Sequence, residues 1–321
     1  MSVPIPSELE ISVFGKAVMK DMINRSAENE ADRRSFLRAA GATGLGVVGA
    51  TATVGALGGA AEAAPKISDG AILNFALNLE YLEAEFYNLA VYGQGLPAKL
   101  TGGKGKKGGV VGGSAVPFKT PAIAAYAREI AGDELDHVKF LRTALGSAKV
   151  ARPAIDLQGS FTAAATAAGL ITAGQTFNPF LDEDSFLLAA FLFEDVGVTA
   201  YKGAAPLISN KTYLEAAAGI LSVEAYHAGI VRSALYSKGL QAQVQKLSDA
   251  RDSLDGKKDI DQGIGDATTA NLVPTDKNGI TYSRDPFQVH NIAYLTTKAK
   301  GRGGFFPKGT NGTFTRSKKT A

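Results

Sequence analysis

Two short segments pair a glutamate with a histidine at a spacing that suits metal binding. Glu134 and His137 form one Glu-x-x-His pair, and Glu224 and His227 form a second pair 90 residues later. Residues three apart on a helix lie on the same face, so each pair can direct a carboxylate and an imidazole towards one point. The sequence therefore predicts that both pairs are metal ligands.

Two single glutamates precede these pairs, and each has a tyrosine seven residues further on. Glu80 precedes Tyr87, and Glu194 precedes Tyr201. The Glu-x-x-His segments repeat as well, with an offset of 90 that relates Ile130, Glu134, His137, Arg142, Ala144 and Leu145 to Ile220, Glu224, His227, Arg232, Ala234 and Leu235. Such an internal repeat predicts two similar halves that contribute equally to a shared site.

Together the two halves supply four carboxylates and two imidazoles, which are the oxygen and nitrogen ligands that a pair of divalent ions needs. Four negative charges balance two divalent cations, so the loaded site is formally neutral. Without metal, carboxylates in a low-dielectric core raise one another's pKa values, so metal binding should release protons and stabilise the fold. The chain has no cysteine, which excludes thiolate ligands and disulfides.

Neighbouring polar residues have alternative interpretations. Glu83 shares the helical stripe of Glu80 and could replace it as a ligand, but only Glu80 matches the glutamate-to-tyrosine spacing of the second half. Glu85 points away from this stripe and is expected in solvent. Tyr87 and Tyr201 are expected either to hydrogen-bond a carboxylate or to take a catalytic, redox role beside the ligands.

Three further residues are expected to support the structure. Asp133 and Asp195 adjoin ligands in the sequence but face other directions, which predicts salt bridges or hydrogen bonds that hold the ligands. His290 has no glutamate at a matching spacing and is expected to be structural or exposed.

Four segments have the helical periodicity that could position the ligands: residues 68–92, 121–145, 182–204 and 212–238. The longest connection between them is residues 146–181. This order of lengths predicts an all-α, up-down-down-up four-helix bundle with one long crossover.

The first part of the chain differs in composition from the helical part. Arg33 and Arg34 are followed by an uncharged Ala/Gly/Val run at residues 39–61, which resembles a twin-arginine export signal with a cleavage site near Ala64. A membrane anchor is the alternative, but the run is only weakly apolar. We therefore expect export to the periplasm or the extracellular space, with no stable membrane span after cleavage.

Composition also divides the chain and excludes one class of partner. We expect the signal at residues 1–64, the bundle at 65–240, and a mostly irregular C-terminal extension at 241–321 with one short helix near 286–298. The net charge of +3 comes from 34 basic and 31 acidic residues that are intermixed, so no field directed at nucleic acid is expected. Self-association through the extension is an open alternative.

The chain resembles ferritin-like proteins, and within them the branch that includes bacterial and plant desiccation-related proteins. The resemblance is carried by residues 73–87, both Glu-x-x-His segments, and residues 287–294 and 303–309. It implies that one metal is held by Glu80 and His137, the other by Glu194 and His227, with Glu134 and Glu224 bridging. The implied cofactors are two iron or two manganese ions, and no haem is expected because no haem-binding methionine is evident.

Two functional hypotheses follow. Two redox-active metals held by carboxylates can bind O2 or peroxide and exchange two electrons, which predicts a ferroxidase-like or peroxide-consuming protein, or a di-manganese catalase. The other hypothesis is a non-catalytic desiccation or stress protein, in which the bundle is a scaffold or surface protein and the metal is structural or vestigial. Storage in a 24-subunit shell is not expected, because the crossover and the extension would have to be accommodated.

Overall fold

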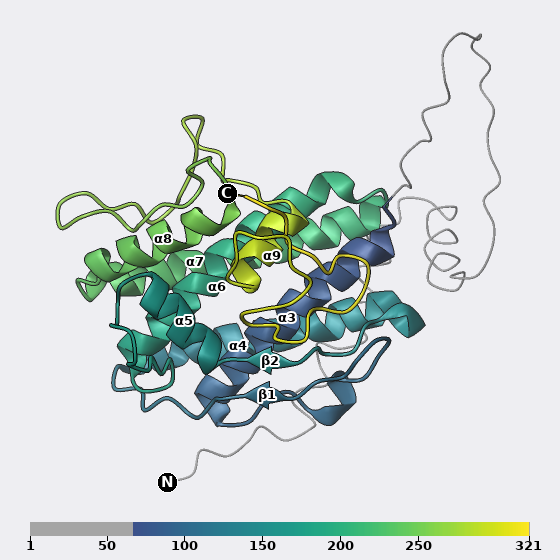
Figure 1. Cartoon of the computed structure of the whole chain (residues 1–321), viewed down its shortest axis with the longest axis horizontal. Coiled ribbons are helices and arrows are strands. Elements are labelled where there is room, and N and C mark those ends of the chain that lie inside the picture. The colour runs from purple at the N-terminus through teal and green to yellow at the C-terminus, as the bar shows by residue number, and fades with distance from the viewer. Residues whose placement is uncertain (1–66, 321) are drawn as a thin grey trace.

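A computed structural model describes residues 67–320 of the chain (Figure 1). The expected export signal lies outside the described residues. Within them, seven α-helices and one two-stranded parallel sheet are present, so the all-α prediction is confirmed. None of these helices is both long enough and apolar enough to cross a bilayer.

Four long helices form two hairpins. The first hairpin is α3 (Asp69–Tyr92) with α4 (Pro121–Leu145), and the second is α6 (Glu183–Ala204) with α7 (Lys211–Ser237). Their ends follow from local chemistry. The side chains of Ser68, Asp182 and Asn210 accept hydrogen bonds from backbone N–H groups in the first turns of α3, α6 and α7. All four helices lie within one residue of their predicted limits at each end.

The two helices of each hairpin are buried to different extents. In α3, 19 of 24 residues are buried, and in α6, 18 of 22 are buried. In α4 and α7, only 10 of 25 and 9 of 27 residues are buried. The helices α3 and α6 are therefore central, and α4 and α7 present one face to solvent.

The connections contain structure that the sequence did not predict. The crossover carries helix α5 (Gly159–Ala167) and strand β2 (Ile155–Asp156), and β2 pairs with strand β1 (Val110–Val111) of the α3–α4 connection. In this parallel pair, Val110 is opposite Ile155 and Val111 is opposite Asp156. Three 3₁₀ turns, η1 (Ala98–Leu100), η2 (Gly146–Ala148) and η3 (Ala205–Leu207), complete the connections.

The C-terminal extension covers the central helices. It begins with α8 (Gln241–Asp255), a helix that was not predicted, and it contains the expected short helix as α9 (Pro286–Ala293). Figure 1 shows α9 and the last, yellow segment lying across α3 and α6. The side chain of Asn78 in α3 donates to the carbonyl oxygen of Asn311 at 2.9 Å, so the extension closes over α3.

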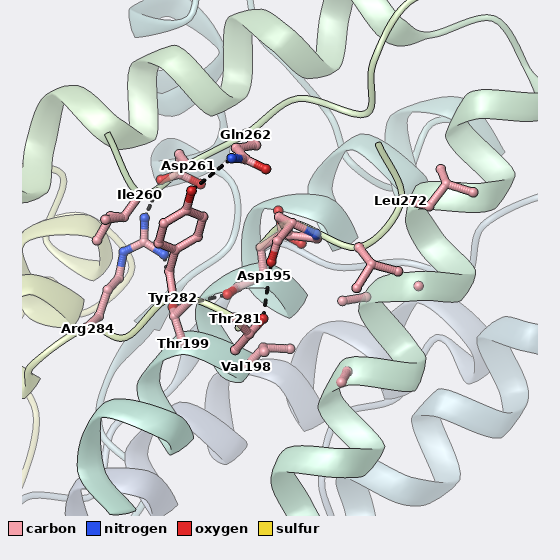
Figure 2. A pocket seen from close by; sticks show the side chains of 15 residues that line it. Asp195, Val198, Thr199, Ile260, Asp261, Gln262, Leu272, Thr281, Tyr282 and Arg284 are labelled. Atoms are coloured by element: carbon pink, nitrogen blue, oxygen red, sulfur yellow. Dashed lines mark hydrogen bonds and ion pairs between the residues drawn. The ribbon is translucent and has the colours of Figure 1, made fainter. Parts of the chain in front are cut away.

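Buried ion pairs fix the extension to the bundle. Asp195 of α6 binds Arg232 of α7 and Arg251 of α8, each at 2.7 Å, and Asp261 pairs with both Arg251 and Arg284. Figure 2 shows Arg284 pointing to Asp261 beside a small cavity of about 70 Å³. Since all these side chains are buried, removing any one would take away a partner from at least one charge in a low-dielectric core. The salt bridges that the sequence predicted for Asp195 are its contacts with Arg232 and Arg251.

Candidate metal centre

The six predicted ligands come together inside the bundle. Glu80 comes from α3, Glu134 and His137 from α4, Glu194 from α6, and Glu224 and His227 from α7. Their exposed fractions range from 0% to 8%. They form two groups that share Glu134, and within each group the candidate ligand atoms lie within 4.8 Å of one another. The repeat in the sequence therefore corresponds to a convergence of side chains in space.

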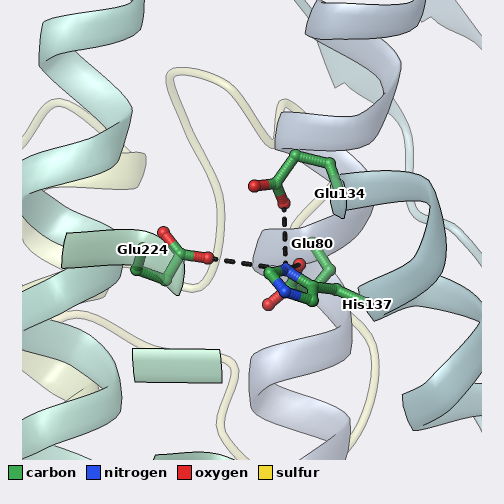
Figure 3. Close-up of side chains that lie close together, drawn as sticks. All are labelled: Glu80, Glu134, His137 and Glu224. Atoms are coloured by element: carbon green, nitrogen blue, oxygen red, sulfur yellow. Dashed lines mark ion pairs between the residues drawn. The ribbon is translucent and has the colours of Figure 1, made fainter. Parts of the chain in front are cut away.

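The first group surrounds His137. Its Nδ1 lies 3.2 Å from Glu80 Oε2, 3.5 Å from Glu134 Oε2 and 3.8 Å from Glu224 Oε1. Figure 3 shows these three carboxylates directed towards the imidazole from three different helices. Three oxygens and one nitrogen around a common point form a ligand set that suits one divalent ion.

The second group surrounds His227. Its Nδ1 lies 3.1 Å from Glu134 Oε1 and 3.6 Å from Glu194 Oε2. Glu134 thus directs one oxygen to each histidine, as a bridging carboxylate would. Glu224, the other expected bridge, is placed only in the first group.

The ligand atoms have no other partners. Eight buried atoms at this point lack a hydrogen-bond partner among the described residues: Glu80 Oε2, both Glu134 oxygens, Glu194 Oε2, both Glu224 oxygens, and Nδ1 of His137 and His227. The distances above are within the range of ion pairs, but none of these contacts has the geometry of a hydrogen bond. Buried polar atoms are almost always paired in folded proteins, so eight such atoms facing one another fit a site for cations.

The protonation of the metal-free site is unusual. Burial raises the pKa of Glu80 to about 7 and holds the pKa of Glu224 well above its ordinary value. Burial would also raise the pKa of Glu134, but the imidazolium groups of His137 and His227 outweigh burial and lower it. Burial opposes the charge on His137, yet its carboxylate neighbours raise its pKa well above the ordinary value. Protons therefore balance the negative charge that metal ions would neutralise.

The two tyrosines orient the ligands of the opposite hairpin. The hydroxyl of Tyr87 donates to Glu194 Oε1, and that of Tyr201 donates to Glu80 Oε1. Both tyrosines are buried. In each glutamate the other oxygen, Oε2, faces a histidine. These contacts are those of the predicted hydrogen-bonding role, in which each tyrosine fixes the direction of a carboxylate.

Asp133 makes the two halves unequal. Nε2 of His227 lies 3.0 Å from Asp133 Oδ2, and a carboxylate can only accept, so Nε2 carries the proton. The lone pair of a neutral His227 is then on Nδ1, which faces the ligand group. At the offset of 90 residues the second half has Val223, whose side chain cannot accept a hydrogen bond from His137. The expectation that Asp133 supports a ligand is met by this contact, but its lack of a counterpart was not predicted.

A second asymmetry involves Glu83. The offset that relates Glu80 to Glu194 relates Glu83 to Gly197. A Cβ atom at Gly197 would overlap Glu224 Oε2 and lie 3.5 Å from Glu83 Oε1, so the missing side chain makes room for both carboxylates. Glu83 is 5% exposed but belongs to neither group, so Glu80 and not Glu83 is part of the cluster that could hold metal. The glutamate-to-tyrosine spacing had already favoured Glu80. The signal that was missed is the interruption of the repeat at Gly197, which leaves room for the Glu83 carboxylate.

Two other residues differ from or refine what the sequence indicated. Glu85 was expected in solvent, but it is fully buried, where it pairs with Arg152 and accepts a hydrogen bond from the Leu96 backbone at 3.0 Å. The crossover supplies Arg152, which local periodicity cannot reveal. His290 is structural: it is buried, with its ring nitrogens 2.7 Å from the Pro286 carbonyl oxygen and 3.0 Å from the Thr310 hydroxyl.

Comparisons with known proteins agree with this arrangement. The family model described as "Ferritin-like domain" matches residues 68–237, which include all four long helices. The desiccation-related protein PCC13-62 of Craterostigma plantagineum is 29% identical over 76% of this chain and 83% of its own length. The ferritin-like catalase Nec2 of Nesocodon mauritianus is 27% identical over 76% of this chain and 84% of its own length. No solved structure matches the chain.

Proposed function

Because the chain belongs to the ferritin-like domain family, we propose that its buried cluster binds two redox-active divalent ions and consumes hydrogen peroxide as a catalase does. The observation that carries the proposal is the set of eight buried carboxylate and imidazole atoms that have no hydrogen-bond partner in the part of the chain that the structure describes. The similarity to a protein named a ferritin-like catalase supports the choice of peroxide. Iron and manganese both accept this ligand set, so either ion is a candidate.

The residues of the chain would contribute binding, orientation and exclusion of water. A pair of such ions supplies the coupled electron transfers by which two hydrogen peroxide molecules become two waters and one dioxygen. Glu134 joins the two ligand groups, so it would hold both ions in one unit. Tyr87 and Tyr201 keep Glu194 and Glu80 aimed inwards, and complete burial of the carboxylates keeps bulk water from competing for the ions.

The test is metal content followed by gas and peroxide measurements. Protein purified from its native host should contain about two metal ions per chain, because helix bundles with this set of four glutamates and two histidines hold two ions. A catalase releases one O2 for every two peroxides, whereas a ferroxidase takes up O2 when Fe²⁺ is added. An oxygen electrode and peroxide absorbance separate these activities.

The control is a matched pair of double variants. Glu134→Ala with Glu224→Ala should lose nearly all the metal and all the activity. Glu129→Ala with Glu215→Ala changes exposed glutamates on the same two helices and should lose neither. Native protein that contains no metal, or metal retained in the first double variant, would end the proposal.

A second candidate function is a non-catalytic protein of desiccation or stress. It is favoured by the similarity to the desiccation-related protein and by the extension of about 80 residues beyond the family match. In that case the metal would be structural, and it would not change its oxidation state with O2 or peroxide.

We further propose export through the twin-arginine pathway, supported by the arginine pair and the apolar run that follows it. Cell fractionation with and without Arg33→Lys and Arg34→Lys tests that route.

A further inference from the structure

A small cavity lies between the bundle and the C-terminal extension. Its volume is about 30 Å³, and its walls come from α3, α6, α9 and Phe305. The bundle contributes Glu83 and Gly197, together with aliphatic and aromatic side chains. The extension contributes Val289, Ile292 and Ala293 of α9. Glu83 is the only residue lining the cavity whose side chain carries a polar group.

The cavity borders the proposed metal centre through two of the residues that line it, Glu83 and Gly197. A Cβ atom at Gly197 would overlap Glu224 Oε2 and lie 3.5 Å from Glu83 Oε1, so both carboxyl groups border the space that a side chain would fill there. Glu224 is a member of the first ligand group. A molecule in the cavity would therefore lie beside Glu83, whose carboxyl group is next to that of Glu224 at Gly197.

The size and lining of the cavity restrict its occupant. A single water needs roughly 10–15 Å³ of such space, so the cavity has room for a molecule of two heavy atoms. The walls exclude anions, because no positively charged side chain lines the cavity to offset their desolvation. The Glu83 carboxyl group can hydrogen-bond to peroxide in either protonation state, since peroxide both donates and accepts.

We propose that this cavity is the antechamber through which a small uncharged oxidant, hydrogen peroxide or dioxygen, reaches the metal centre, with α9 and Phe305 setting the size limit. This inference rests on the proposed function. It assigns to the extension a task that the family domain alone does not perform, since residues 68–237 supply only the inner walls. A bulky hydroperoxide would be rejected by the cavity before it met the metal.

Two substitutions change the cavity in opposite directions. Ala293→Leu adds three carbon atoms to its wall and should slow peroxide consumption by about tenfold or more, as added methylenes do in tight pockets. Phe305→Ala widens the cavity and should let the loaded protein consume tert-butyl hydroperoxide, which the wild type should not. Phe306→Ala is the matched control, because Phe306 is equally buried and adjacent in sequence but does not line the cavity.

A binding measurement gives a readout that does not depend on turnover. Nitric oxide is a probe of two heavy atoms, and its association with iron-loaded protein can be followed by stopped-flow absorbance. Ala293→Leu should slow this association by about tenfold, with unchanged iron content, because it narrows the same route. O2 uptake and peroxide decay, measured separately on the same variants, show which oxidant uses the cavity.

The outcomes separate the two proposals. If wild-type protein with two ions consumes neither peroxide nor O2, the proposed function fails and the antechamber fails with it. If the wild type is active but Ala293→Leu changes neither turnover nor nitric oxide association, only the antechamber is overturned. Equal gains with tert-butyl hydroperoxide in Phe305→Ala and Phe306→Ala would also overturn it, because the effect would then be general loosening of the core.

Discussion

Asp133 of the first hairpin accepts a hydrogen bond from His227 of the second hairpin, at 3.0 Å, across the gap between α4 and α7. The contact fixes the imidazole so that Nδ1 faces Glu134 and Glu194. Such a carboxylate behind a histidine ligand increases its basicity and holds its orientation. Because Val223 occupies the matching place in the other half, the two metal positions should differ in affinity.

Asp133→Ala should weaken the binding of one metal ion and leave the binding of the other nearly unchanged. Loss of a hydrogen-bond partner behind a ligand lowers metal affinity by about 10–100-fold. Titration of metal-free protein with Co²⁺ or Mn²⁺ should resolve a tight step that moves and a weaker step that does not. Asp136→Ala is the control, because Asp136 is exposed and its ion pair, among the described residues, is with Lys139. A uniform loss at both steps would contradict the inequality of the two positions.

Tyr87→Phe and Tyr201→Phe should each lower metal affinity. Each change removes the hydroxyl that orients one glutamate, and loss of a hydrogen bond to a buried charged group corresponds to about 1–3 kcal/mol. Tyr294→Phe provides the comparison, since Tyr294 bonds to Thr310 within the extension. That variant should lower the free energy of unfolding without changing metal affinity. If all three variants bind metal like the wild type, the tyrosines do not position the ligands.

Metal affinity should rise with pH across the neutral range. Burial raises the pKa of Glu80 to about 7, so below that pH the carboxyl group holds a proton that an incoming cation must displace. Each displaced proton makes affinity fall by about tenfold per pH unit below the pKa of the group. A pH indicator in weakly buffered protein should record acidification when Mn²⁺ is added at pH 6.5. The same addition to the Glu134→Ala, Glu224→Ala protein should produce no signal.

Gly197→Ala should disrupt the site, although alanine usually favours a helix. The new Cβ would overlap Glu224 Oε2, so the carboxylate must move and the first metal position should lose Glu224 as a ligand. Gly219→Ala on α7 is the contrasting case, because nothing lies near the position of its Cβ. That variant should be more stable than the wild type by about 0.5–1 kcal/mol. Metal analysis and thermal unfolding of both variants would distinguish crowding of the site from a helix effect.

Arg284→Ala should destabilise the whole protein. It leaves Asp255 and Asp261 buried without this partner, and breaking such a pair costs about 3–5 kcal/mol. Arg302→Ala changes an exposed arginine and should shift the free energy of unfolding by less than about 0.5 kcal/mol. Chemical denaturation of both variants gives the comparison. Equal stability of the two would mean that the ionic network does not anchor the extension.

The parts of the fold that repeat along the sequence were predictable. The four long helices followed from apolar periodicity, and the duplication of Glu-x-x-His indicated which side chains converge. What could not be predicted depends on segments distant in sequence. Glu85 has the local pattern of a solvent-facing residue, but Arg152 of the crossover buries it. Helix α8 is polar along its sequence, and it is held by the contact of Arg251 with Asp195, 56 residues away.

The asymmetry of the site also could not be predicted from the ligand residue types. The repeat predicted equal halves, whereas the chemistry depends on two positions where the repeat is broken, Val223 and Gly197. A valine and a glycine carry no functional group, so reasoning from ligand types passes over them. Their importance appears only when the groups opposite them, Asp133 and Glu83, are seen in place.

The contact between Asn78 and Asn311 has a consequence for how the protein is made. The two residues are 233 positions apart, and the Asn311 backbone N–H also donates to the Asn78 side chain at 3.0 Å. At ordinary rates of translation, roughly 10–50 s pass between the synthesis of one residue and the other. During that interval α3, with 19 of its 24 residues buried in the folded protein, lacks the cover that this contact fixes, so it is a segment on which we expect a chaperone to act until Asn311 has been made.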